Sequence, residues 1–274
     1  MKSERKKKII VHIVLLAGCI VMLFPFVWML LTALKSYTEA TRLPPTIFPE
    51  MINLSNLPKA LNALPFKDMY FNTFSMMFFR ILFALVFSSL AGYAFAKLEF
   101  PLKKFLFSIV LVQLMLPTQI FILPQYNMVA KLGWLNSIPA LVFPGLVSAF
   151  GVFFLRQFYM SLPNELCEAA YLDGCNQGKI FIKIMLPLTK TPLMALSIFT
   201  AIFAWSDLMW PLIVNMSIDK MTLAAGIASI KGQFFTDYPV LMSASFVAMI
   251  PMLVLYLVFQ KQFVEGIAMT GTKG

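Results

Sequence analysis

The stretch IIVHIVLLAGCIVMLFPFVWMLLTAL, residues 9–34, lies between Lys8 and Lys35 and contains no Asp, Glu, Lys or Arg. A membrane-spanning helix needs about 20 consecutive, mostly apolar residues. The apolar part of a cleavable signal peptide is shorter, about 7–15 residues. The stretch therefore predicts a first transmembrane helix that is retained and that follows a basic cytoplasmic N-terminus, residues 1–8.

The rest of the chain is comparably apolar. Of its 274 residues, 60% are hydrophobic and 12% are charged, whereas soluble domains have about 25% charged residues. Five more apolar segments follow, at about 71–96, 105–123, 132–155, 191–214 and 238–260. The sequence predicts an all-α membrane protein of six transmembrane helices. An external loop, 35–70, precedes a transmembrane domain, 71–260, and a cytoplasmic C-terminal tail, 261–274.

The net charge of +10 sets the orientation. The basic residues fall between apolar segments, which indicates a membrane protein rather than a nucleic-acid-binding protein. The N-terminus, residues 97–104, residues 156–190 and the C-terminal tail together hold 14 of the 22 Lys and Arg residues. Cytoplasmic loops carry the excess of Lys and Arg. Both termini are therefore expected in the cytoplasm, with the loops 35–70 and 215–237 outside.

The titratable residues argue against an enzyme. Cys19, Cys167 and Cys175 are odd in number and scattered, so they predict neither a disulfide framework nor a metal site. His12 is the single histidine, and no convergent set of acids and bases of the kind that catalysis requires is evident. No G-x-x-x-x-G-K-S/T phosphate loop is present. We expect no metal, no cofactor and no ATP hydrolysis in this chain itself.

A polar stretch, LPNELCEAAYLDGCNQGKIFIKIMLPLTKTPL, residues 162–193, separates the fourth and fifth apolar segments. Pro163 and Asn164 are suited to the start of a helix. Gly174 provides a turn or a position of close approach, and Pro187 interrupts a second, amphipathic helix. The stretch predicts two short cytoplasmic helices joined at Gly174, a shape suited to docking.

Within this stretch, EAA, three residues, G, nine residues and I-M-L-P follow one another. They match the EAA-x3-G-x9-I-x-L-P signature, and the chain therefore resembles the permeases of binding-protein-dependent ABC importers. In that family the loop, here 158–190, forms a coupling helix in a cleft of the ATPase subunit. The resemblance implies that Glu168 and Gly174 take part in this contact. The signature positions are Glu168, Ala169, Ala170, Gly174, Ile184, Leu186 and Pro187.

Two further patterns resemble the carbohydrate permeases of the maltose type, in particular their second permease subunit. The ending GIAMTGTKG, residues 266–274, is similar to their glycine-rich tail, which implies an ATPase contact by Gly271, Lys273 and Gly274. AWSDLMWPLI, residues 204–213, is similar to their W-N-D/E-F-L-W-P-L pattern, with Ser206 in place of the usual Asn.

The resemblance implies an assembly in the inner membrane. Its members would be this permease subunit, a second permease subunit, two ATPase subunits that use ATP and magnesium, and an external solute-binding protein. The substrate implied is a carbohydrate, and no nucleic acid is involved. Two alternatives stay open, namely an ABC permease for a non-sugar solute such as a polyamine, and an ion-driven secondary transporter. The latter should show polar groups in broken helices and often internal repeats.

Arg80 and Asp207 are charged residues placed inside apolar segments. Charges at membrane depth are costly and usually face protein or water, so both are candidates for the translocation path. Asp207 lines that path or fixes the helix ending near Trp210 and Pro211. Arg80 lines the path, extends its charge to an interface or has a partner in the protein. A direct pair between the two is compatible with the sequence but does not follow from it.

Overall fold

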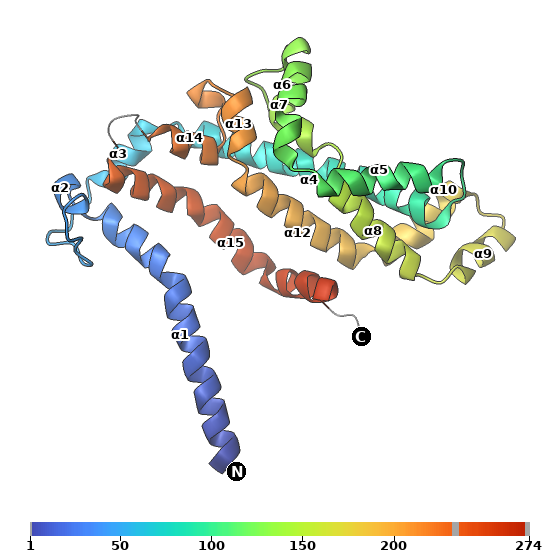
Figure 1. Cartoon of the computed structure of the whole chain (residues 1–274), viewed down its shortest axis with the longest axis horizontal. Helices are drawn as coiled ribbons and strands as arrows, with labels where there is room; N and C mark the ends of the chain where they lie inside the picture. Colours follow the sequence, from blue (N-terminus) through green and yellow to red (C-terminus); the bar gives the residue numbers. More distant parts are fainter. Residues whose placement is uncertain (1, 232–235, 272–274) are drawn as a thin grey trace. The chain divides into compact units, whose positions relative to one another are not determined.

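The computed structural model describes residues 2–231 and 236–271, and within them every regular element is a helix (Figure 1). The chain divides into two compact units, Met1–Phe66 with Gly226–Leu253 and Lys67–Ala225 with Val254–Gly274. Three of the described helices are long and apolar enough to cross a membrane. The number rises to six if each of three bent helix pairs is one span. The fold is thus that of a helical membrane protein with three to six spans.

The first unit contains a long apolar helix followed by an ordered polar segment. Its helices are α1 (Lys2–Ala33), α2 (Tyr37–Ala40), α3 (Asn56–Ala63) and the first part of α15 (Tyr238–Gly271). Asn56 Nδ2 donates to the carbonyl oxygens of Ala33 and Lys35, both at 2.8 Å. The buried carboxylate of Glu39 accepts from the Glu50 amide at 2.9 Å. These bonds satisfy buried polar groups and give the segment after α1 a defined structure.

The second unit contains most of the helices. They are α4 (Phe66–Lys97), α5 (Lys103–Met115), α6 (Ile122–Lys131), α7 (Ile138–Val142), α8 (Ala149–Ser161), α9 (Glu165–Leu172), α10 (Gln177–Ile180), α11 (Leu186–Leu188), α12 (Lys190–Ser206), α13 (Met209–Val214) and the start of α14 (Leu223–Ser229). Short 3-10 segments lie at Thr118–Phe121, Phe143–Gly145 and Ile218–Lys220, and a π-helical segment at Phe181–Met185.

Glycines let α4 and α12 lie close to α8. A Cβ at Gly92 would be 3.0 Å from the backbone nitrogen of Arg156, and a Cβ at Gly151 would overlap Ser88 Oγ and lie 3.1 Å from Leu196 Cδ2. Small residues at such contacts allow the backbones of membrane helices to approach one another. Gly92 and Gly151 therefore bring α4, α8 and α12 together.

Two hydrophobic clusters form the core of the second unit. The first gathers Tyr93, Tyr159, Ile180, Phe181 and neighbouring residues. The second is built from Met76, Val129, Leu141, Trp210, Val214 and their neighbours. Because α4 contributes Tyr93 to one and Met76 to the other, a single continuous helix connects the two clusters.

Three of the predicted apolar segments are not single straight helices. The helix expected at 105–123 ends at Met115 and turns by 107° into Thr118–Lys131, because Pro117 lacks an N–H and pushes the residue before it towards an extended backbone. The segment 132–155 is split into two helical parts bent by 44°. The segment 191–214 stops at Ser206, where Asp207 is extended, and resumes in α13. At the C-terminus, α15 continues as a helix to Gly271.

Candidate functional site

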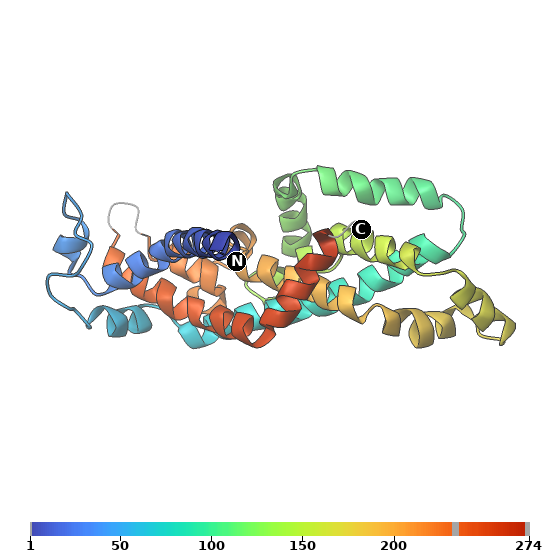
Figure 2. The ribbon, with the colours of Figure 1, turned by 90° about the horizontal axis from the view of Figure 1, so that it is seen from below.

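The signature stretch lies at one end of the second unit, together with the α4–α5 turn (Figures 1 and 2). The beginning of α9 is tied to the end of α4 by Lys97. Its ammonium donates to the Leu162 carbonyl and to Asn164 Oδ1, both at 2.6 Å. Two short helical parts joined by a turn are present, as the sequence predicts, and the first is fixed to the longest helix of the unit.

Gly174 forms the turn after α9. Its φ of +76° lies in the left-handed region. The Gly174 amide donates to Tyr171 O at 3.0 Å and the Cys175 amide donates to Ala170 O at 2.9 Å. These two hydrogen bonds are the pattern of a Schellman motif at the end of a helix. A Cβ at Gly174 would meet nothing within 4 Å. Within this chain, the glycine is therefore needed for its conformation rather than for close packing.

The signature positions fall into two groups. Ala170, Ile184 and Leu186 pack into or against the Tyr93 cluster, whereas Glu168, Ala169, Gly174 and Pro187 are exposed. Beside them, Leu172 is 90% exposed at the end of α9. One side of the stretch is therefore fixed to the unit, and the other presents acidic, small and apolar residues.

Tyr93 connects α4 to the second half of the stretch. Its hydroxyl donates to Gln177 Oε1 at 2.7 Å. Its ring centroid lies 5.2 Å from that of Phe181 and 5.8 Å from that of Tyr159. Such tilted and edge-to-face aromatic pairs are favourable beyond the area they bury. The sequence reasoning missed Tyr93 and Lys97, because neither lies in the signature.

The thiols near the stretch are not paired. Cys167 and Cys175 are free, half-buried and packed against the Tyr93 cluster. Burial raises the pKa of the Cys167 thiol, Lys97 lowers it by a smaller amount, and Glu168 raises it. A raised pKa keeps the thiol protonated and unreactive near neutral pH, which fits a packing role.

The structure brings Arg80 and Asp207 together, a pairing that the sequence left open. Arg80 Nη1 lies 2.8 Å from Asp207 Oδ2, and the side chains are 8% and 22% exposed. Arg80 Nε and Nη2 also donate to the Leu141 carbonyl at 3.0 and 2.6 Å. A buried charge is tolerated when it is paired and its remaining donors are satisfied. Asp207 is also the residue at which α12 ends, so the helix-ending role and the cavity-lining role coincide.

Pro144 explains why the backbone oxygen of Ala140, next to the Leu141 oxygen that Arg80 binds, is free to accept a side-chain donor. Proline has no N–H, so the carbonyl four residues before it, that of Ala140, has no helical partner. The indole Nε1 of Trp210 donates to this oxygen at 2.8 Å. At Gly145, a Cβ would lie 2.5 Å from Arg80 Cγ, so only glycine leaves room for the arginine stem. Pro144 and Gly145 were the available sequence signals for this environment.

A cavity of about 600 Å³ surrounds the ion pair and lies at the break between α12 and α13. Besides the two charges, its lining is rich in uncharged polar side chains, including Thr118, Gln119, Gln125, Ser148, Thr200 and Ser206. Pockets of about 300–1,000 Å³ with a few convergent polar groups are typical of small-molecule sites. The cavity therefore has the size and polarity of a solute site, and its two charges compensate each other.

The remaining predicted positions add little. Gly271 is the last residue of α15, and Lys273 and Gly274 lie outside the described residues. Across residues 2–231 and 236–271, no group of three or more His, Cys, Asp or Glu side chains is placed to hold a metal ion.

Comparison with a solved structure shows the same fold. The chain is similar to a chain in the crystal structure of a bacterial ABC transporter involved in the import of the acidic polysaccharide alginate. The TM-score is 0.79, the sequence identity is 21%, and the similarity covers 96% of this chain and 98% of that one.

Sequence relatives lie closer. The arabinooligosaccharides transport system permease protein AraQ of Bacillus subtilis is 34% identical over 256 residues, which are 92% of this chain and 91% of that protein. The sn-glycerol-3-phosphate transport system permease protein UgpE of Escherichia coli O1:K1 is 34% identical over 264 residues, 93% of this chain and 94% of that protein. Residues 84–266 match the model of a family described as binding-protein-dependent transport system inner membrane component. The chain belongs to this family of inner-membrane permease subunits of ABC importers.

Proposed function

We propose that this chain is one of two permease subunits of an ATP-driven importer that carries a carbohydrate, such as an oligosaccharide, across the inner membrane. The three long apolar helices, the bent pairs within 103–131 and 138–161, and α12 with α13 would provide six spans, with both termini in the cytoplasm. A different permease subunit, two ATPase subunits and an external solute-binding protein would complete the assembly. ATP and magnesium would be used by the ATPase subunits.

The exposed face of α9 is the observation that carries this proposal. Leu172 is 90% exposed next to Glu168 and Gly174, and the same stretch lies at the end of the unit where both α4 and α8 finish (Figure 1). Leu166 and Tyr171 of the same helix are also exposed, and an exposed group of apolar side chains bordered by polar residues favours a protein contact. An ATPase cleft with a basic side chain for Glu168 would cover this face.

The mechanism follows from α4. Closure of the ATPase subunits on ATP would displace α9, and Lys97 and Tyr93 would transmit this displacement to α4. Seventeen residues or fewer separate these two from Arg80, which holds Asp207 at the broken end of α12. Substrate drives such a change only through different affinities for the outward-open and inward-open states. The cavity around the ion pair is where those affinities would differ.

The cavity favours an uncharged polyhydroxylated substrate. Its hydroxyl and amide side chains can both donate and accept hydrogen bonds, as sugar hydroxyls do. Arg80 is already occupied by Asp207 and Leu141, so no free cation is offered to a phosphate group. The name of the UgpE relative supports a second candidate, a glycerol-phosphate-like substrate, which would require the ion pair to open.

Exchange of the coupling residues tests the proposal. In the assembled transporter, Glu168→Lys and Gly174→Asp should abolish uptake of an arabinooligosaccharide and substrate-stimulated ATP hydrolysis, with insertion into the membrane intact. Glu165→Lys is the matched control, because it reverses the same charge on the same helix outside the signature. Gly174→Asn is the control for the turn, since Asn is often tolerated in the left-handed conformation.

Several results would contradict the proposal. Normal uptake in both Glu168→Lys and Gly174→Asp would show that these two residues do not couple the permease to the ATPase. Purification of the chain, tagged at its N-terminus, from active membranes without a phosphate-loop ATPase and a second permease would remove the proposed assembly. Stimulation of ATP hydrolysis by sn-glycerol 3-phosphate but not by neutral oligosaccharides would replace the carbohydrate by the second candidate.

A further inference from the structure

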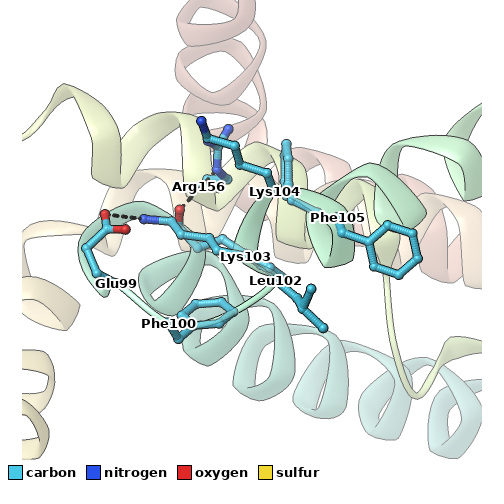
Figure 3. Close-up of a pocket in the computed structure, with 9 residues that line it drawn as sticks. Glu99, Phe100, Leu102, Lys103, Lys104, Phe105 and Arg156 are labelled. Carbon is cyan, nitrogen blue, oxygen red and sulfur yellow. Dashed lines mark hydrogen bonds and ion pairs between the residues drawn. The ribbon is translucent and has the colours of Figure 1, made fainter.

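A second pocket, separate from the ion-pair cavity, lies where α4 ends and α5 begins. Its volume is about 700 Å³, and its wall carries three cations, Lys103, Lys104 and Arg156, one acid, Glu99, and four phenylalanines (Figure 3). No signature residue lines it. The coupling role and the proposed sugar path therefore leave this group of charges unexplained.

The positive charge of this pocket is only partly compensated. Lys103 Nζ is 2.9 Å from Glu99 Oε1. Arg156 Nε donates to Phe95 O at 3.2 Å, and its guanidinium carbon lies 4.0 Å from the centre of the Phe107 ring. In the part of the chain that the structure describes, the terminal nitrogens of Arg156 and the ammonium of Lys104 have no hydrogen bond or ion pair.

The turn between α4 and α5 forms part of the pocket wall and carries hydrogen bonds of its own. Leu102, on its wall, has a φ of 61°, a left-handed conformation that is uncommon for a residue other than glycine. Lys103 Nζ donates to Leu98 O at 2.7 Å across the same turn. The stacking of Arg156 on Phe107 fixes the plane of the guanidinium. Lys103 and Arg156 are thus held in place by contacts within the chain, and of the three cations a ligand would need to order only Lys104.

On the side where α5 begins, the pocket borders an exposed apolar surface. From the same turn, α5 presents the exposed side chains of Phe105, Ile109 and Val112. A helix of this composition lies beside lipid or protein in a membrane, and a turn between two apolar helices lies at the level of the headgroups. The pocket thus offers cations at the headgroup level and an apolar face that leads away from them.

We propose that this pocket binds the phosphodiester headgroup of an anionic phospholipid, with one acyl chain along α5. Arg156 would bind the phosphate through its two free terminal nitrogens, because a guanidinium matches two phosphate oxygens, and Lys104 would add a second cation. Basic pockets between membrane helices on the cytoplasmic side are suited to anionic headgroups. The site goes beyond the proposed transport function and does not depend on the identity of the transported solute.

Photo-cross-linking of the assembled transporter tests this site. The probe is a phosphatidylglycerol with a photoreactive acyl chain, and the readout is the half-saturating probe concentration for labelling of peptides from residues 95–112 and 150–160. Lys104→Gln, on an exposed side chain, should raise this concentration about fivefold, and Lys104→Gln with Arg156→Gln roughly 30-fold if the contributions add. Lys104→Arg should restore binding. Lys131→Gln, which removes a charge outside the pocket, should change nothing.

Three outcomes would overturn the proposal. Equal labelling by a photoreactive phosphatidylcholine would show an ordinary boundary lipid without headgroup selection. An unchanged half-saturating concentration in Lys104→Gln and in the double variant would show that Lys104 and Arg156 do not bind the headgroup. Complete displacement of the probe by excess inorganic phosphate would replace the lipid with a free anion. Labelling that is selective for phosphatidylglycerol, sensitive to Lys104 and resistant to inorganic phosphate would establish the site.

Discussion

The last turns of α4 and its middle carry opposite kinds of site. Near Tyr93 and Lys97, the α9 stretch leaves most of its distinctive residues exposed. Near Arg80, the charges are enclosed, paired and surrounded by backbone acceptors. An exposed site is completed by a partner, whereas an enclosed one is completed within the chain. Substitutions at the first should therefore affect coupling with little loss of stability, and substitutions at the second should affect stability directly.

The largest effect is expected from Arg80→Met. This change keeps the apolar stem but leaves Asp207 and the Leu141 carbonyl without their donors. Breaking a buried pair on one side costs about 3–5 kcal/mol, and the partial exposure of Asp207 favours the lower end of this range. The thermal unfolding midpoint of the purified assembly should fall by several degrees. Glu168→Gln, at the exposed site, should leave that midpoint unchanged. Equal midpoints in both variants would contradict the proposed difference between the exposed and the enclosed site.

Asp207→Asn separates the two roles of this carboxylate. The amide keeps the size and one acceptor oxygen, so most of the geometry at the α12 break should persist. A change in substrate-stimulated ATP hydrolysis at an unchanged unfolding midpoint would assign Asp207 to the solute path. Unchanged stimulation with a lower midpoint would instead assign it to ending α12.

A pair of glycine substitutions gives the next largest difference. At Gly145, an added methyl group would lie 2.5 Å from Arg80 Cγ, and overpacking of this kind costs about 1–3 kcal/mol. At Gly178, in α10, the nearest atom would be 3.7 Å away, and alanine favours a helix over glycine by up to about 1 kcal/mol. Gly145→Ala should lower the unfolding midpoint of the assembly, and Gly178→Ala should maintain or raise it. The reverse order would contradict the packing around Arg80.

Tyr93→Phe probes the link between the exposed site and α4. It removes the hydrogen bond to Gln177, worth about 1 kcal/mol, and retains the aromatic packing. We expect fewer substrate molecules imported per ATP hydrolysed, with a small change in stability. Tyr126→Phe is the control near the enclosed site, because the Tyr126 hydroxyl has no hydrogen bond among the residues described. An equal loss in both variants would show that hydroxyl removal itself, and not the link to α10, is responsible.

The same contrast separates what could be predicted from sequence from what could not. The α9 stretch was predictable in outline because its turn, at Gly174, depends on local backbone conformation and its signature is contiguous. The Arg80–Asp207 pair joins residues 127 positions apart, and no local pattern specifies such a contact. A helix ending at Asp207 was one of the two roles that the sequence left open. The 107° bend after Met115 did not follow from the sequence, because apolar composition predicts that a segment enters the membrane but not whether its helix is continuous. Pro144 is evident in the sequence and leaves the Ala140 carbonyl without a helical donor. That Trp210 donates to this carbonyl could not be predicted, because the two residues are 70 positions apart.

The smallest effect concerns Cys167, and it tests the electrostatics of the exposed end. Because its thiol pKa is raised by burial, the pH midpoint of its alkylation by N-ethylmaleimide should lie above about 8.5, the value of a free cysteine. In a chain with Cys19→Ser and Cys175→Ser, Lys97→Gln removes a charge that lowers this pKa and should move the midpoint higher. Glu168→Gln removes a charge that raises the pKa and should move the midpoint lower. Limited access to the thiol would slow alkylation at every pH without moving the midpoint, so opposite shifts in the two variants require both charges to lie near Cys167. Shifts in the same direction would mean that the end of α4 and the start of α9 are not joined as Lys97 and Asn164 join them.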